Sequence, residues 1–282
     1  MPAPGFQLAS DDCHVWTLPL EQPPKVLEQL RCSLSQEEIR RADRYRFAQQ
    51  RRQFILTRGA LRGLLGCYLD MAPEHCRITL SESGKPELAA TPFEHRPDVS
   101  RSRDRSLMHP DDVSADVAHA SDQTKGQPME HTVRFNVAHA GDQALIAIAR
   151  DVQVGVDIEL LRPLDERQAL VDMILSPTEK ERWQLLSEEM RIRAFYVLWT
   201  RKEAVAKAIG QGLLMELNTL GVSFEPGLPA TLLEIPEMYG RPQDWTLVAL
   251  DAAAEYAAAL AAPARGIRVV QKTWHPQGVP LH

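Results

Sequence analysis

The sequence predicts an α/β (α+β) protein made of two similar halves. Helix-initiation patterns recur 141 positions apart, and short apolar runs of strand length lie around them. The composition, 44% hydrophobic and 25% charged, is that of an ordinary globular protein. Because 282 residues exceed the roughly 100 to 200 that are usual for one domain, we expect an N-terminal half at residues 1–150 and a C-terminal half at 151–282.

The repeat is clearest where two helices are expected to begin. Ser35-x-x-Glu38 and Ser176-x-x-Glu179 both have the spacing of a capping box, and Pro177 suits the first helical position. Downstream, apolar residues at helical spacing predict one core-facing stripe in each half. These residues are Phe54, Leu61, Leu64 and Leu65 in the first half, and Phe195, Leu198, Trp199 and Ala206 in the second.

Strands are expected around these helices, and one segment breaks the pattern. The predicted strands cover residues 14–16, 77–80, 144–149, 222–224, 245–250 and 256–261. Residues 94–132 are rich in Ser, Asp, Arg, His and Pro with few apolar residues, so we expect a disordered insertion there. Its histidines, His95, His109, His119 and His131, are too irregularly spaced to favour metal binding.

Charge and cysteine content exclude several classes of protein. A net charge of −6 argues against a general nucleic-acid binder, although arginines gather between Arg40 and Arg62. The 4 cysteines form no Cys-x-x-Cys pair, which favours reduced thiols in a cytoplasm. The first 20 residues do not resemble an export signal, and the longest apolar run, near Ala252 to Ala262, is interrupted by Glu255. We therefore expect a cytoplasmic protein without a membrane span.

The hexapeptide from Val154 to Glu159 alternates apolar and acidic residues. On a strand, side chains two apart share a face, so Asp157 and Glu159 are expected to converge. Paired carboxylates need a cation between them, and their oxygens suit Mg²⁺. The alternative is the solvent-facing edge of an amphipathic strand.

A predicted helix follows at residues 195–207, with Trp199, Glu203 and Lys207 in one row at a spacing of four. One helix face then offers an aromatic ring, a carboxylate and an ammonium group. The alternative is an ordinary surface ion pair between Glu203 and Lys207. Gly210-Gln211-Gly212 is interpreted as the end of this helix and not as a phosphate loop.

Two further stretches carry polar groups at expected turns. Residues 135–142 lead into a predicted strand and place His139 at a turn, where its ring can donate to a phosphate or serve only a structural role. Ser83-Gly84-Lys85-Pro86 has the composition of a turn and contributes the cation Lys85.

In this order, these stretches resemble the 4'-phosphopantetheinyl transferase superfamily, in its larger, monomeric, surfactin-synthetase-activating type. The resemblance covers nearly the whole chain, from His14-Val15-Trp16 to Gly212. Its most specific part is Gly-x-Asp-x-Glu at 155–159 followed by Trp-x-x-Lys-Glu-x-x-x-Lys at 199–207. The resemblance implies the fold of that family, two α/β halves related by pseudo-twofold symmetry.

The resemblance also implies roles for individual residues. Asp157, Glu159 and Glu203 would hold Mg²⁺ against the pyrophosphate of coenzyme A. Glu203 is the expected general base, with Glu159 or a metal-bound water as alternatives. The phosphates would be gripped by cationic side chains, namely Lys207, His139, Lys85, Arg41 and Arg52. Ala138 and Ala140 stand where the family often has serines, which removes two possible hydroxyl donors.

The implied reaction moves 4'-phosphopantetheine from coenzyme A to a serine of an acyl or peptidyl carrier protein and releases 3',5'-adenosine bisphosphate. Such carriers belong to fatty acid, polyketide and nonribosomal peptide synthetases, which include enzymes of secondary metabolite biosynthesis. Under the 141-residue shift, Trp16, Leu18 and Arg62 replace the three acids, so one active site and a monomer are sufficient. The alternatives are another Mg²⁺-dependent phosphoryl or nucleotidyl transferase, a phosphatase, or a non-catalytic scaffold that binds coenzyme A or carrier domains.

Overall fold

A computed structural model describes residues 6–81, 84–89, 132–163, 168–211 and 215–276. The predicted insertion at 94–132 lies outside these ranges except for Thr132, so it stays a prediction, as does the division into halves at residue 150. No helix within the described ranges is both long and apolar enough to cross a membrane.

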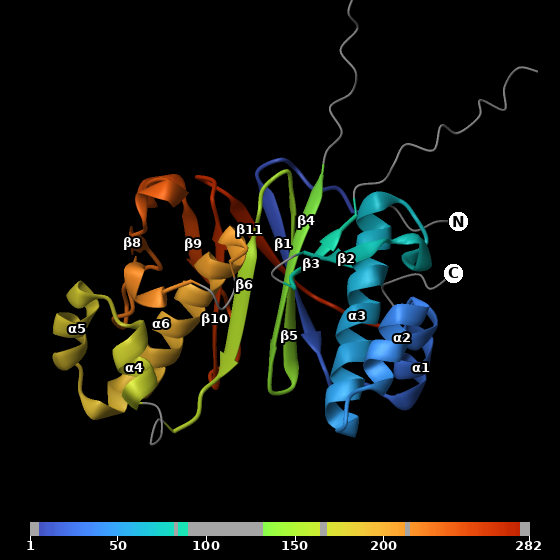
Figure 1. The fold of residues 1–282 in the computed structure, drawn as a ribbon, viewed down its shortest axis with the longest axis horizontal. Helices are drawn as coiled ribbons and strands as arrows, with labels where there is room; N and C mark the ends of the chain where they lie inside the picture. The colour runs from blue at the N-terminus through green and yellow to red at the C-terminus, as the bar shows by residue number, and fades with distance from the viewer. Residues whose placement is uncertain (1–5, 82–83, 90–131, 164–167, 212–214, 277–282) are drawn as a thin grey trace, which may run out of the picture. The chain divides into compact units, whose positions relative to one another are not determined.

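The first half contains one strand, three helices and then more strands (Figure 1). Its elements are β1 (Asp12–Pro19), α1 (Pro24–Cys32), α2 (Gln36–Asp43), α3 (Ala48–Leu69), the 3-10 turn η1 (Pro73–His75), β2 (Ile78–Leu80), β3 (Pro86–Leu88), β4 (Val133–Ala140) and β5 (Gln143–Arg150). The order of β1, α2 and α3 matches the prediction.

The second half begins with the same succession of elements. They are β6 (Gly155–Leu160), α4 (Gln168–Ile174), α5 (Pro177–Gln184), α6 (Glu188–Ile209), η3 (Leu217–Thr219), β7 (Gly221–Val222), β8 (Leu232–Glu234), η4 (Glu237–Tyr239), η5 (Pro242–Asp244), β9 (Thr246–Ala249), β10 (Tyr256–Ala262) and β11 (Arg268–Thr273). Helices α3 and α6 are each 22 residues long, and α2 and α5 are each 8. The predicted similarity of the halves is therefore present at the level of elements.

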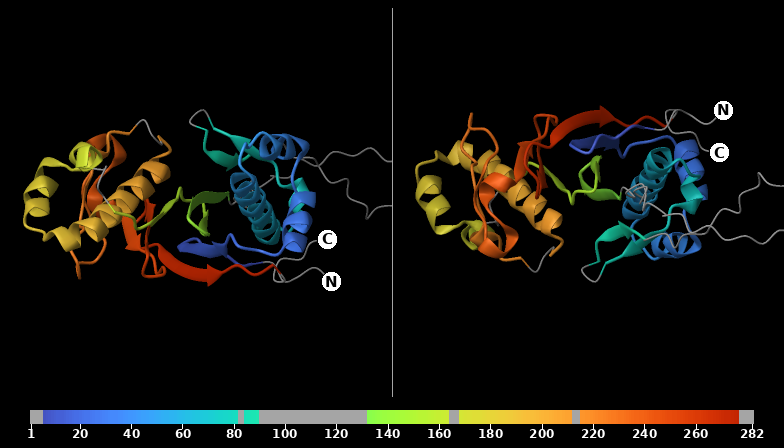
Figure 2. Two further views of the ribbon diagram at one scale, coloured as in Figure 1. Left: turned by 90° about the horizontal axis from the view of Figure 1, so that it is seen from below. Right: turned by 90° about the horizontal axis from the view of Figure 1, so that it is seen from above.

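Two main sheets form from these strands. One has the order β11-β1-β5-β4 and the other β6-β10-β9. Strand β11 was not predicted, and it runs parallel to β1, as Figure 2 shows for the red and blue strands at that edge. Its first residue, Arg268, donates to both carboxylate oxygens of Asp12 at 2.7 Å. The first sheet thus includes a strand from the end of the chain.

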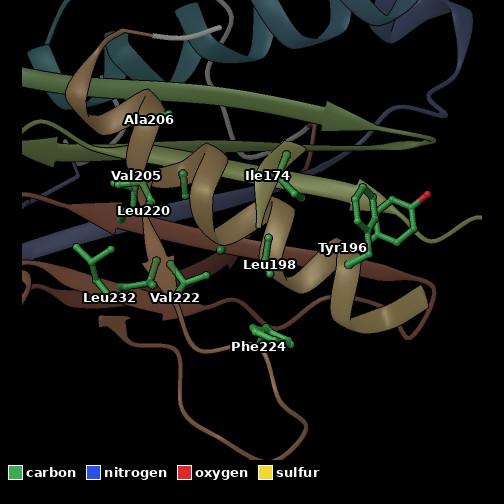
Figure 3. Close-up of a cluster of buried hydrophobic side chains, with 14 of the residues drawn as sticks. Ile174, Tyr196, Leu198, Val205, Ala206, Leu220, Val222, Phe224 and Leu232 are labelled. Carbon is green, nitrogen blue, oxygen red and sulfur yellow. The ribbon is translucent and has the colours of Figure 1, made fainter. Parts of the chain in front are cut away.

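The apolar core has three layers because strand residues alternate between two faces. In β1, Trp16 and Leu18 pack toward α3, whereas Cys13 and Val15 pack against the second sheet. On the other side of that sheet, α6 covers Ala257, Ala259 and Ala261 of β10. Figure 3 shows this last cluster, in which residues of α6 meet residues from the β7–β8 region. The layers are therefore helix, sheet, sheet, helix.

Both predicted capping boxes are confirmed. The hydroxyls of Ser35 and Ser176 accept from the amides of Glu38 and Glu179, and each glutamate accepts in return from the amide of its serine. The two serines also have nearly the same backbone angles, φ −68° with ψ 161° and 162°. Gly210 ends α6 with φ 89°, as predicted.

Each capping-box glutamate also pairs with a buried cation on the long helix of its half. Glu38 accepts from Arg62 at 2.7 Å, and Glu179 accepts from Lys202 at 2.5 Å. These two cations are 140 positions apart, not 141, and so are the ends of α3 and α6. The counterpart of Glu203 in the first half is therefore Gly63, which corrects the assignment of Arg62. The offset between the halves is 141 residues at the start of the short helices α2 and α5 and 140 residues at the start of the long helices α3 and α6, so it changes in the segments between them.

Candidate active site

Helix α6 and strand β6 approach each other closely at Gly155. A Cβ atom placed on Gly155 would overlap the carbonyl oxygen of Ala204 and the amide nitrogen of Ala208. Glycine is therefore required for this approach, because any side chain would push the strand away from the helix. The close contact lies at the start of β6 and near the end of α6, next to the predicted acidic residues.

The acidic residues of β6 lie on the same face as Gly155. Asp157 and Glu159 follow it at a spacing of two, so all three positions face α6. Asp157 meets Lys207 of α6, whose Nζ is 2.6 Å from its Oδ1 and 3.4 Å from the carbonyl oxygen of Val156. Lys207 thus pairs with the strand and is more than a surface partner of Glu203, whose pKa it also lowers.

Burial controls the charge of both Asp157 and Glu203. The side chain of Asp157 is 7% exposed, and this burial raises its pKa although Lys207 acts to lower it. Burial also raises the pKa of Glu203, with Lys207 lowering it and Asp157 raising it further. Glu203 and Asp157 are therefore close enough for their charges to interact.

The donor set fits a divalent cation in one specific respect. Oδ2 of Asp157 is buried and accepts no hydrogen bond from the described part of the chain. A buried carboxylate oxygen without a partner is costly, and Mg²⁺ takes carboxylate oxygens as ligands. No group of three His, Cys, Asp or Glu side chains within the described ranges is arranged to hold a metal ion, so the predicted set of Asp157, Glu159 and Glu203 is not preassembled.

His139 lies in strand β4 and not at a turn, which corrects the prediction. The turn follows at Gly141, and β4 runs beside β6, where Oδ1 of Asn136 accepts from the amide of Val156 at 2.9 Å. Burial and the charge of Lys207 lower the pKa of His139, whereas the charge of Asp157 raises it. The effect of Asp157 indicates that the His139 ring lies near this acidic residue. His139 is exposed on β4, where its ring lies beside the cavity described below.

Lys85 links the predicted turn of the first half to the end of α6. Its Nζ donates to the carbonyl oxygen of Lys207 at 2.9 Å and to Oε1 of Gln153 at 3.4 Å. A cation at a helix C-terminus is favourable, although burial lowers the pKa of Lys85. Gly84 has φ 79°, as a turn requires, while Ser83 lies outside the described residues.

A cavity of about 280 Å³ lies beside His139. Its wall is formed by α2, α3 and the segment between them, the β2–β3 turn and β4, and it includes Arg41, Tyr45, Phe54, Thr57, Arg58, Gly84 and His139. The guanidinium of Arg41 lies over the ring of Phe54 at 5.4 Å. The cavity therefore combines cations with an aromatic surface.

Arg52 is not part of this cavity. It donates to the carbonyl oxygen of Gln22 and lines a second cavity of about 570 Å³, on the other side of Gln53. Because it lies two residues before Phe54 on α3, it points to a different side of the helix. The structure thus places Arg41 and His139 at one cavity, joins Lys85 to the end of α6 near Lys207, and leaves Arg52 at another cavity.

Arg58 is a lining residue that the sequence prediction missed. It lies 3.6 Å from Oε1 of Glu38 and over the ring of Phe54 at 5.8 Å. Burial lowers its pKa, against the effect of Glu38. The signal for it was the run of arginines along α3, whose spacing alone does not show which ones face the cavity.

Ala138 and Ala140 face away from the cavity. They alternate with Val137 and His139 along β4 and pack in the apolar cluster between the two sheets. Alanine is therefore the residue type that this packing favours, because a hydroxyl there would lose its water contacts.

Comparisons with known proteins agree with the resemblance. Residues 153–261 match the model of the 4'-phosphopantetheinyl transferase superfamily. The 4'-phosphopantetheinyl transferase HetI of a Nostoc species is 30% identical over 96% of this chain and 95% of its own length. A putative 4'-phosphopantetheinyl transferase of a Synechocystis species is also 30% identical, over 73% of this chain and 68% of its own length.

Among solved structures, one titled as a complex of an ACPS protein with CoA from "Chronobacterium ammoniagenes" has 22% identity. It covers 39% of this chain and 95% of its own, with a TM-score of 0.31. The two relatives above, in contrast, match most of the chain. On that basis, the chain belongs to the 4'-phosphopantetheinyl transferase superfamily, in its larger type.

Proposed function

We propose that this enzyme transfers 4'-phosphopantetheine from coenzyme A to a serine hydroxyl of an acyl or peptidyl carrier protein in a Mg²⁺-dependent reaction. The carriers would be domains of fatty acid, polyketide or nonribosomal peptide synthetases, which includes secondary metabolite biosynthesis. We also propose that the enzyme acts in the cytoplasm as a monomer, because both halves of one chain supply residues to one site.

The observation that carries the proposal is the environment of Asp157. One of its oxygens is paired with Lys207, and the other is buried without a hydrogen-bond partner among the described residues. Asp157 is also near enough to Glu203 for its charge to raise the pKa of that residue. A cation and a phosphate group would satisfy this arrangement, since the site then holds compensating charges of both signs. A solvent-facing strand edge would not bury these groups.

Different residues of the chain would bind the phosphates, the adenine base and the Mg²⁺ ion. Arg41 and Arg58 line the cavity, His139 lies at its edge and Lys207 beside Asp157, so they can meet phosphates of coenzyme A. The aromatic surface of Phe54 and Tyr45 suits the adenine base. Asp157, Glu159 and Glu203 would hold Mg²⁺, which would neutralise charge on the phosphates and on the leaving group.

The chemical step is a displacement at the β-phosphorus of coenzyme A. Glu203 takes the proton from the carrier serine, with Glu159 as the alternative base, and the serine oxygen forms the new bond to phosphorus. The bond from that phosphorus to the bridging oxygen breaks. The electron pair stays on 3',5'-adenosine bisphosphate, next to the cationic side chains. A raised pKa suits Glu203 to this role, because it makes the carboxylate a stronger base.

The experiment is to incubate the protein with coenzyme A, Mg²⁺ and an apo carrier protein and to measure the mass of the carrier. The proposal predicts one added phosphopantetheine and an equal amount of 3',5'-adenosine bisphosphate. A carrier whose acceptor serine is replaced by alanine should remain unmodified.

The same experiment separates the alternatives. Hydrolysis of small phosphates with Mg²⁺, without modification of any carrier, would support a phosphatase and contradict the proposal. Binding of coenzyme A without any product would support a non-catalytic scaffold.

A further inference from the structure

The β4–β5 turn, which follows His139, is held by a tyrosine from the other sheet. Tyr256 is the first residue of β10 and is 4% exposed. Its hydroxyl donates to Oδ1 of Asp142 at 2.5 Å and accepts from the amide of Asp142 at 3.3 Å. One hydroxyl thus contacts both the side chain and the backbone of the turn.

Gly141 makes this contact possible. It has φ 55°, and a Cβ atom placed there would lie 2.5 Å from the hydroxyl oxygen of Tyr256. The same turn is held from the other side, where Gln53 donates to the carbonyl oxygen of Gly141 at 2.9 Å and Leu20 to that of Asp142 at 2.7 Å. The turn is therefore fixed between α3 and β10.

The two strands that Tyr256 connects are those that carry the site. Tyr256 pairs with Leu160 at the end of β6, the strand of Asp157, and Gly141 follows His139 by two residues. Among the strands that the structure describes, those of the first sheet share no ladder hydrogen bonds with those of the second, so side chains and packing must fix the relative position of the sheets. Tyr256 connects the two sheets at the C-terminal ends of β4 and β6.

We propose that Tyr256 is a positioning residue that sets the place of His139 relative to Asp157, and through it the affinity for coenzyme A. The proposal rests on the proposed function, in which His139 contacts a phosphate of coenzyme A. Tyr256 is not among the residues that line either of the two cavities described above. It acts through the β4–β5 turn.

The test compares Tyr256→Phe with the wild type by calorimetric binding of coenzyme A and by steady-state carrier modification. We expect the Kd for coenzyme A to rise about tenfold, as for the loss of one hydrogen bond to a charged group, with kcat at saturating coenzyme A unchanged. Tyr239→Phe is the matched control, because Tyr239 lies in η4 against the α6 cluster, and its Kd should stay at the wild-type value.

A double-mutant cycle distinguishes positioning from general stability. In a His139→Ala background, Tyr256→Phe should change the Kd for coenzyme A less than twofold, because the residue through which it acts is gone. Asp142→Asn keeps an oxygen acceptor for the hydroxyl and should remain near the wild type, whereas Asp142→Ala should resemble Tyr256→Phe. These aspartate variants also serve if Tyr256→Phe folds poorly.

An equal rise in Kd with and without His139, or no rise at all, would overturn the proposal. Failure of the proposed function has a different signature. If the wild type binds coenzyme A but modifies no carrier, the transfer reaction is contradicted while the binding cycle still decides the role of Tyr256. A wild type that does not bind coenzyme A would overturn both.

Discussion

Asp157 combines a structural ion pair with a carboxylate oxygen that we propose binds a ligand. Its Oδ1 is compensated by Lys207, so the residue tolerates burial, while its buried Oδ2 has no partner among the described residues. Such an oxygen raises the free energy of the folded protein unless a ligand binds it. This cost is expected at a site that is completed by its ligand.

The first prediction concerns that cost. Mg²⁺ should raise the melting temperature of the wild type, because a ligand that binds only the folded state stabilises it, by about 2.7 kcal/mol at a hundred times its Kd. Asp157→Asn should abolish this shift and lower carrier modification at least a hundredfold. The exposed Asp251→Asn is the control. An undiminished Mg²⁺ shift in Asp157→Asn would place the metal elsewhere.

The second prediction separates the two candidate bases. A base must be ionised to accept the serine proton, and the pKa of Glu203 is raised above its ordinary 4.5, so kcat/KM should fall as the pH decreases through that raised value. The measurement is a pH profile at low Mg²⁺, which reports the free enzyme. Glu159→Gln should keep this acidic limb and Glu203→Gln should lose it. The reverse result would make Glu159 the base.

At the scale of elements, the structure repeats one device. In each half, a capping-box glutamate at the start of a short helix binds a buried cation of the long helix. Lys202 is fully buried and also donates to the carbonyl oxygens of Ile174, Leu217 and Leu220. It directly precedes Glu203, so this network fixes the rotation of α6 and thereby the direction of the acidic side chain.

The third prediction tests this device. Lys202→Met should lower the free energy of unfolding by about 3 to 5 kcal/mol, because it leaves the carboxylate of Glu179 buried without its cation. Urea unfolding measures the loss, and the exposed Lys180→Met should stay within about 0.5 kcal/mol of the wild type. The double variant Lys202→Met, Glu179→Gln should lose less than the sum of its single variants. Full additivity would contradict a direct pair.

Elements with local signals could be predicted from the sequence. The capping boxes, the alternation of β6 and the glycine that ends α6 each depend on a few adjacent residues, and all are confirmed. Strand β11 could not be predicted, because it forms only by pairing with β1 at the opposite end of the chain. His139 was misplaced because it is the second-last residue of a strand that ends directly before Gly141, so its sequence context resembles the turn itself.

The site residues were predictable to different degrees. Asp157 and Lys207 belong to specific motifs, and they lie 2.6 Å apart as their shared site requires. The cations of α3 were harder, because its arginines lie on several sides of the helix and only packing decides which side chains reach the cavity. Arg58 was missed for this reason, and Arg52 was included although it lies at another cavity.

At the scale of the whole chain, the halves have diverged around a shared architecture. The first half contributes the cavity with Arg41, Arg58 and His139, and the second contributes the acidic face of β6 and α6. An apolar cluster joins the two sheets between them. Gly63 stands where the second half has Glu203, so the long helix of the first half does not provide the corresponding acid.

The central claim is that the β6–α6 acidic face performs phosphopantetheine transfer. The most direct measurement follows holo-carrier and 3',5'-adenosine bisphosphate together by mass spectrometry, for the wild type, Glu203→Gln and the exposed control Glu181→Gln. We expect equal amounts of both products from the wild type and the control, and at least a hundredfold lower rate from Glu203→Gln with its fold intact. Equal rates for all three proteins, or release of the nucleotide without modification of the carrier, would contradict it.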